Sequence, residues 1–239
     1  MIPPKEGNWM LELKNVHPSE HQVVGADAYT KLGEIDEKRM SIELWWTGCS
    51  FDPGESEFNN VTAIAFGFYQ YYINAAGNQS TRRTFIVRLL VPGAAGGLPR
   101  WEYYNNAGGW TAIDDDARQV AGLTWTPWND DDRFCWQYSK LTINLDYEND
   151  GTYQYESLTV NDTTWPINAD CETTALGVGV FQSALVPYLY SQFSASLYDV
   201  AEEEWQGFTY VDQINVWAND MQNYGAAATA FGQKSGPGA

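Results

Sequence analysis

The chain has 239 residues, a formal net charge of −18 at pH 7, 44% hydrophobic residues and 15% aromatic residues, including 11 Trp. This negative charge excludes nucleic acid as a main partner, because proteins bind a phosphate backbone through clustered Lys and Arg. No apolar run reaches the roughly 20 residues of a membrane-spanning helix, so we expect no membrane span. The N-terminal residues also lack a basic stretch followed by an apolar one, so we expect no secretion signal in this chain.

The N-terminal half of the chain alternates apolar and polar residues, which is the pattern of half-buried antiparallel strands. Turn sequences separate these runs, as at Ala76-Gly77-Asn78 and in the Asn- and Gly-rich residues 105–109. Each of these turns predicts a β-hairpin. The sequence predicts strands in residues 7–13, 26–32, 40–47, 61–73, 84–91, 100–104, 110–113 and 123–125.

A strand meander in residues 136–166 is the clearest feature of the C-terminal half. Leu141, Ile143 and Leu145 alternate with polar residues, so we expect them to face one core together with Val160 of the next strand. Further strands are predicted in residues 153–160, 175–181 and 208–217. Residues 187–201 show no clean period and are left unassigned.

No long amphipathic helix and no internal repeat is visible in this pattern. We therefore expect residues 1–224 to form a single all-β domain, which is an ordinary size for a β-sandwich. The remaining residues, 225–239, are rich in Gly, Ala and Ser and have no core face. We expect them to form a C-terminal tail.

Several of these strands resemble, in their order along the chain, the concanavalin A-like lectin/glucanase and laminin-G-like sandwiches. The similarity covers roughly residues 7 to 217. It rests on Gly7-x-Trp9-x-Leu11-x-Leu13, Ile42-Glu-Leu-Trp-Trp46, Leu141-Thr-Ile-Asn-Leu-Asp146, Leu158-Thr-Val-Asn161-Asp162 and Tyr210-Val-Asp212-Gln-Ile-Asn-Val216. The resemblance implies an all-β fold with two curved antiparallel sheets in a jelly-roll sandwich of concanavalin A-like type. It also implies that a glycan or Ca²⁺ would bind on the concave face or the rim loops.

The hydrolytic members of that family carry Glu-x-Asp-x-x-Glu on one strand, because the two catalytic carboxylates must lie about 5 Å apart. The nearest sequence here is Glu34-Ile-Asp36-Glu-Lys-Arg39, in which Arg39 takes the place of the second Glu. We therefore expect no enzymatic activity of this type. A carboxylate pair drawn from separate strands, as in another glycan hydrolase or lyase, stays open as a third hypothesis.

Two acidic segments in long loops are candidate Ca²⁺ sites. Asp114 and Asp116 lie in the first, and Asp130 and Asp132 lie in the second. Carboxylate oxygens from two loops suit a hard cation such as Ca²⁺. The alternative interpretation is two solvated acidic loops with no cofactor at all.

Aromatic residues near one predicted hairpin are candidate glycan contacts, because sugars stack on exposed Trp and Tyr rings. The candidates are Trp101, Tyr103, Trp110 and Trp128. Alternation places Trp101 and Tyr103 on one face of their strand, so part of this set should belong to the core. Trp110 and Trp128 each follow a turn and are the better surface candidates.

Two non-enzymatic functions follow from these features. The first is a structural surface protein of an assembled particle, such as a virion accessory or capsid decoration protein. In such a particle, neighbouring copies or coat proteins would hold the tail, with Phe231 as its anchor. The alternative is a secreted or surface-attached carbohydrate-binding module, which would place the protein outside the cell.

Overall fold

The computed structural model describes residues 11–17, 23–29, 39–47, 61–73, 76, 79–90, 100–105, 109–113, 136–145, 153–171, 181–194, 205–218 and 221–222. Within these ranges all regular structure is β. The strands are β1 (Leu11–His17), β2 (Val23–Tyr29), β3 (Arg39–Thr47), β4 (Val61–Ile73), β5 (Gln79–Leu90), β6 (Arg100–Asn105), β7 (Gly109–Ala112), β8 (Gln137–Asn144), β9 (Tyr155–Val160), β10 (Thr163–Ala169), β11 (Phe181–Ser194), β12 (Trp205–Ala218) and β13 (Met221–Gln222). None of the described segments is a helix that could cross a membrane.

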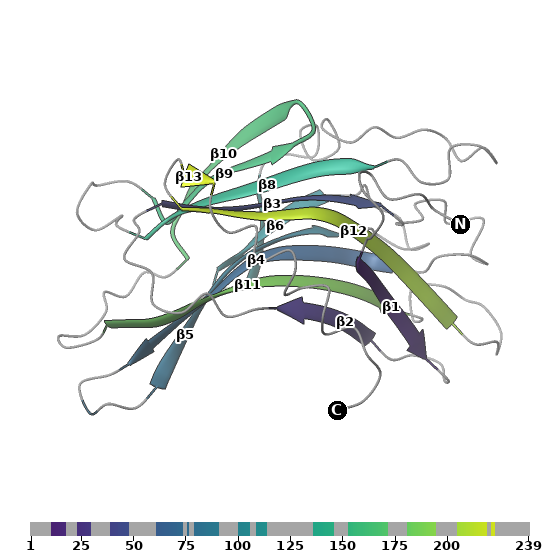
Figure 1. Ribbon diagram of the computed structural model, residues 1–239, viewed down its shortest axis with the longest axis horizontal. Helices are drawn as coiled ribbons and strands as arrows, with labels where there is room; N and C mark the ends of the chain where they lie inside the picture. The colour runs from purple at the N-terminus through teal and green to yellow at the C-terminus, as the bar shows by residue number, and fades with distance from the viewer. Residues whose placement is uncertain are drawn as a thin grey trace.

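The strands form two antiparallel sheets that pack face to face (Figure 1). The seven-stranded sheet, here called sheet A, has the order β1-β12-β3-β8-β9-β10, and β13 pairs with β12. The six-stranded sheet, here called sheet B, has the order β2-β11-β4-β5-β6-β7. The chain passes several times from one sheet to the other. This topology confirms the predicted all-β class and the predicted two-sheet antiparallel sandwich.

One apolar core lies between the two sheets. Alternate residues of β3 face it, and Leu141, Ile143 and Val160 of the neighbouring strands are fully buried there. Leu145 is partly buried and packs against the same cluster. The prediction that these four residues share one core is therefore confirmed. Sheet B contributes Ile64, Phe66, Phe68, Phe85, Val87, Leu89 and Trp101.

Strand β11 is the main element that sequence analysis left unassigned. It lies between β2 and β4 and pairs with both, so it is a central strand of sheet B. Pro187 lies inside it, opposite Phe68 of β4. Proline cannot donate to the ladder and is rare in central strands, which explains why residues 187–194 show no clear strand pattern.

Other predicted strands differ from the structure at their ends. β1 ends at His17, four residues later than expected, and β2 begins at Val23, three residues earlier. Predicted strand residues 7–10, 123–125 and 175–180 lie outside the described residues. The hairpin of β6 and β7 forms as predicted, with Tyr104 opposite Trp110.

The hydroxyl group of Tyr155 connects the two sheets through the core. Tyr155 belongs to β9 of sheet A, but its hydroxyl accepts the N–H of Ile86 in β5 at 2.9 Å. The same hydroxyl lies 2.9 Å from the carbonyl oxygen of Tyr104 in β6, to which it can donate. The pair Val87–Tyr103 is the last one at this end of the β5–β6 ladder. The Tyr155 hydroxyl therefore connects the two strands one residue beyond their last pair.

Close packing surrounds this bridge. The Tyr155 ring meets Phe85 at a centroid distance of 5.7 Å and Tyr103 at 5.3 Å. The buried Cys171 thiol donates to the carbonyl oxygen of Thr84 at 3.1 Å. In β4, Gly67 lies so close to the backbone of Phe85 that a Cβ atom would overlap it. Only glycine fits the position without moving β5.

We predict that Ile143→Ala lowers the free energy of unfolding by about 2–5 kcal/mol, because it removes buried volume and leaves a cavity. Thr142 is the matched control, since its side chain faces away from the core and bonds Ser41 at 3.0 Å. Thr142→Ala should cost about 1 kcal/mol or less. Chemical denaturation of both variants gives the comparison, and similar losses at the two positions would contradict a half-buried β8.

We predict that Tyr155→Phe costs about 1–3 kcal/mol, because the buried Ile86 N–H and Tyr104 carbonyl lose their shared partner. Tyr153→Phe serves as control, since Tyr153 is 48% exposed. It should change stability by about 0.5 kcal/mol or less. Equal midpoints of denaturant unfolding for wild type and Tyr155→Phe would show that the bridge does not stabilise the fold.

Candidate functional site

The side chains of sheet A that point away from the core form an aromatic and polar surface. Alternation dictates its membership, because Met40, Ile42, Leu44 and Trp46 are buried and the residues between them must face outward. The same phase holds in β8. We call this surface the outer face of sheet A and define it by Ser41, Glu43, Trp45, Tyr138, Lys140, Thr142, Asp212, Asn215 and Trp217.

Two aromatic rings lie side by side at one end of this face. Trp45 of β3 is directly opposite Tyr138 of β8. Their ring centroids are 5.5 Å apart with an interplanar angle of 53°. Both side chains are partly exposed. Asp212 of β12 flanks Trp45 on its other side.

A carboxylate lies at the centre of the face. Glu43 of β3 is opposite Asn215 of β12 on one side and Lys140 of β8 on the other. Its Oε2 accepts the Tyr138 hydroxyl at 2.8 Å, and its Oε1 accepts Asn215 Nδ2 at 3.2 Å. Partial burial, reinforced by the hydrogen bond to Glu43 and its charge, raises the pKa of Tyr138 well above its usual value.

A β-bulge in β12 brings Asn215 to this face. The register of β12 against β3 shifts between Asp212 and Asn215, and Gln213 has a left-handed φ of 49°. The Gln213 N–H donates to Asp212 Oδ1 at 2.8 Å, which stabilises the turn of the chain. Because one extra residue is inserted, Ile214 is buried while Asp212 and Asn215 both face outward.

Trp217 and Lys140 complete the face at its other end. The Lys140 Nζ atom lies 5.2 Å from the centre of the Trp217 ring, within reach of a cation–π interaction. The Trp217 indole nitrogen has no hydrogen-bond partner within the described ranges. The outer face of sheet A therefore combines three aromatic rings with hydrogen-bond donors and hydrogen-bond acceptors.

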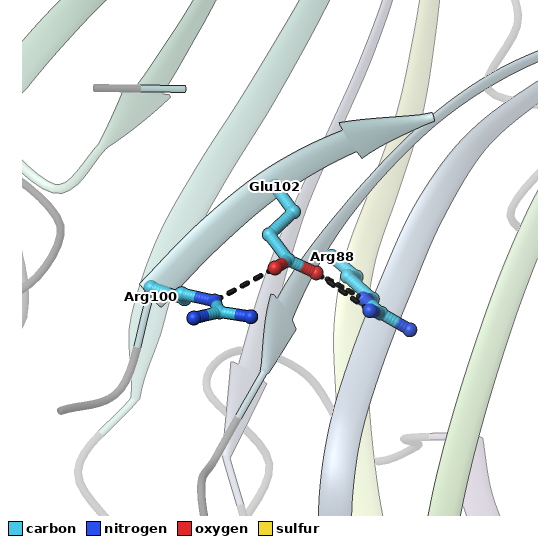
Figure 2. Close-up of polar contacts among 3 residues, drawn as sticks. All are labelled: Arg88, Arg100 and Glu102. Atoms are coloured by element: carbon cyan, nitrogen blue, oxygen red, sulfur yellow. Dashed lines mark hydrogen bonds and ion pairs between the residues drawn. The ribbon is translucent and has the colours of Figure 1, made fainter. Parts of the chain in front are cut away.

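A second polar cluster lies on the outer face of sheet B. Its centre is Glu102 of β6, whose carboxylate lies between two arginines (Figure 2). Arg88 Nε donates to Glu102 Oε2 at 2.7 Å, and Arg100 Nε donates to Oε1 at 2.7 Å. The Arg88 guanidinium lies 4.0 Å above the ring of Trp110, and Tyr104 contacts that ring edge-on at 5.3 Å.

The structure changes the interpretation of three predicted glycan contacts. Trp101 is 1% exposed and packs edge-on against Trp46 and Phe66 in the core, so the expectation of a stacking surface at Trp101 is wrong. Tyr103 is partly buried and also packs against the core. Trp110 is partly exposed, but Arg88 covers one face of its ring.

The other predicted site residues are not described by the structure. They are Trp128, the metal candidates Asp114, Asp116, Asp130 and Asp132, and the tail residue Phe231. Within the described ranges, no three His, Cys, Asp or Glu side chains gather in a way that could hold a metal ion.

The residues predicted from the sequence do not include Trp45, Tyr138 or Trp217, although alternation alone indicates the first two. Once Ile42 and Leu141 are assigned to the core, alternation places Trp45 and Tyr138 on the opposite face of their strands. Trp217 requires one more step, because the bulge at Gln213 reverses the phase of β12. Nothing in the sequence marks that bulge clearly.

Comparisons with known proteins place little constraint on the ligand. No family model and no curated protein matches the chain. Among solved structures, it is similar to the carbohydrate recognition domain of Emp47p, with a TM-score of 0.44 and 10% identity over 86% of this chain and 88% of that chain. It is also similar to the potassium-bound carbohydrate recognition domain of Emp46p, with a TM-score of 0.42 and 13% identity over 89% of each chain. At this level of similarity, neither structure indicates what this chain binds.

We predict that the protein loses stability above about pH 10, the pKa of tyrosine in an unfolded chain. Burial raises the pKa of Tyr210 to about 12, with Glu12 adding to the effect, and the pKa of Tyr138 is raised further. The unfolded chain therefore releases these protons at lower pH than the folded protein does. The contribution of the two tyrosines to stability is fully present below about pH 10 and is lost as pH rises through the folded pKa values. We would measure the free energy of unfolding at a series of rising pH values. Above about pH 10 it should fall less steeply for Tyr138→Phe than for the wild type. An unchanged slope would contradict the environment described for Tyr138.

Proposed function

We propose that the protein is a non-enzymatic carbohydrate-binding module that binds a glycan on the outer face of sheet A. The observation that carries this proposal is the placement of Trp45, Tyr138 and Trp217 around Glu43 and Asn215 on three adjacent strands. Aromatic rings supply a surface for the apolar face of a sugar ring, and the side chains between them supply partners for its hydroxyl groups.

Each polar group has a defined part in this proposal. Glu43 is held by Tyr138 and Asn215 and retains acceptor capacity for a sugar hydroxyl, because a carboxylate has about four lone-pair sites. Lys140 offers N–H donors beside the Trp217 ring. Since the side chains stand on paired strands and contact one another, little conformational entropy is lost when a sugar binds.

We also propose that the protein does not hydrolyse the glycan, and the position of Arg39 supports this. This residue stands where the hydrolytic pattern requires a second Glu, and it heads β3 instead as an ion-pairing residue. Its Nε donates to Glu156 Oε2 of β9 at 2.6 Å. A guanidinium group in this position cannot serve as the acid/base carboxylate. Glu34 and Asp36 lie outside the described residues.

The assembled-particle function stays a prediction from the sequence. In that function the tail, residues 225–239, would be held by neighbouring subunits, and these residues lie outside the described ranges. The two functions are compatible, because a sandwich that tiles a particle could also carry a glycan-binding face. Location in a particle or outside the cell is likewise a prediction.

The test is binding to a panel of neutral glucan, mannan and galactan oligosaccharides, followed by titration calorimetry with the strongest ligand. Trp45→Ala and Tyr138→Ala should each weaken binding about tenfold or more, on the order of 1.4 kcal/mol. Tyr153→Ala, which removes an exposed ring elsewhere, should leave affinity unchanged. No reducing ends should be released from the ligand.

Two results would count against the proposal. Binding that survives both Trp45→Ala and Tyr138→Ala would place the glycan elsewhere on the protein. Release of reducing ends by the purified protein would show that the module is an enzyme.

A further inference from the structure

The arginine cluster of sheet B carries an excess positive charge. Glu102 has a side chain only 4% exposed, and its carboxylate is shared by Arg88 and Arg100 (Figure 2). Two guanidinium groups on one carboxylate leave one positive charge uncompensated within the cluster. This occurs in a chain with 31 acidic and only 13 basic Lys and Arg residues.

Arg100 presents that charge at the surface. Arg88 is 19% exposed, and its guanidinium is already bonded to Glu102 and stacked on Trp110. Arg100 is 46% exposed and contacts Glu102 through Nε. Within the part of the chain that the structure describes, the contact between Arg100 and Glu102 is made through Nε, and no other described residue accepts from the two terminal nitrogens of Arg100. Because the side chain is about half exposed, these N–H groups can meet a ligand from solvent.

We propose that Arg100 binds the carboxylate of an acidic sugar, such as a hexuronate. A planar guanidinium matches a carboxylate through two parallel N–H···O bonds, which a lysine ammonium cannot reproduce. The bond to Glu102 fixes the Arg100 side chain before the ligand arrives, so less entropy is lost on binding.

The surroundings of Arg100 favour a sugar as the carrier of this carboxylate. Ala112 of β7 is opposite Glu102 and is small and exposed, which leaves room beside the cluster. Tyr104, four residues from Arg100 along β6, and Trp110 opposite it are partly exposed on the far side of Glu102, where they offer apolar ring surface to further units of an oligosaccharide. This site lies on the opposite sheet from the outer face of sheet A, so it goes beyond the proposed function and does not depend on it.

The test is calorimetric titration of the full chain with trigalacturonate, in EDTA and at low ionic strength, with neutral galactotriose as reference. The acid should bind at least about tenfold more tightly than the neutral sugar, and Arg100→Ala should remove that advantage. Arg100→Lys should retain only part of it. Arg39→Ala is the matched control, because Arg39 is another exposed arginine paired with a glutamate, and it should change nothing.

The result that overturns the proposal is equal affinity of wild type and Arg100→Ala for trigalacturonate, or no binding by wild type. Asp114, Asp115 and Asp116 follow β7 in the sequence and could bind the acidic sugar through Ca²⁺. EDTA removes Ca²⁺, so binding measured in its presence does not come from this source. Binding that requires Ca²⁺ and survives Arg100→Ala would also overturn it, as would equal competition by a polyglutamate peptide. Trp45→Ala should keep trigalacturonate binding, which separates this outcome from failure of the glycan face on sheet A.

Discussion

The Tyr155 hydroxyl makes a buried polar connection between the two sheets. It satisfies Ile86 and Tyr104 beyond the β5–β6 ladder, where two buried backbone groups would otherwise lack this partner. A polar contact inside a core is geometrically specific, whereas apolar contacts tolerate sliding. Tyr155 therefore favours one position of β9 over sheet B. In that position the apolar side chains of both sheets face each other.

Both polar surfaces follow from this placement of the core. Because Ile42 and Leu141 face inward, Glu43 and Tyr138 can only face outward, and they meet across β3 and β8. The bulge at Gln213 then adds Asn215, which an unbroken strand would have aimed into the core phase. On sheet B, Trp101 faces the core, so Glu102 and Arg100 point to the opposite face of β6, where Glu102 is buried and Arg100 is exposed.

Periodicity predicts much of the fold because β3, β8 and β12 alternate between buried and partly exposed residues over most of their length. The strand at 61–73 and the meander around Leu141 were predicted at or near their observed bounds. β11 was not assigned, because Pro187 lies inside it and interrupts the expected pattern. The site was harder to predict, since the chemistry depends on side chains from strands far apart in sequence, such as Glu43 and Asn215. Trp101 is predicted as a glycan contact but is buried, because an aromatic residue beside a turn can belong to the core as readily as to the surface.

The central claim is that the outer face of sheet A contacts a neutral sugar. NMR of the tryptophan indole N–H groups, with and without the strongest neutral oligosaccharide, tests it most directly. If a sugar stacks on this face, the signals of Trp45 and Trp217 shift, while those of the buried Trp101 and Trp165 stay in place. Saturable shifts confined to other tryptophans, with Trp45 and Trp217 unchanged, would contradict it.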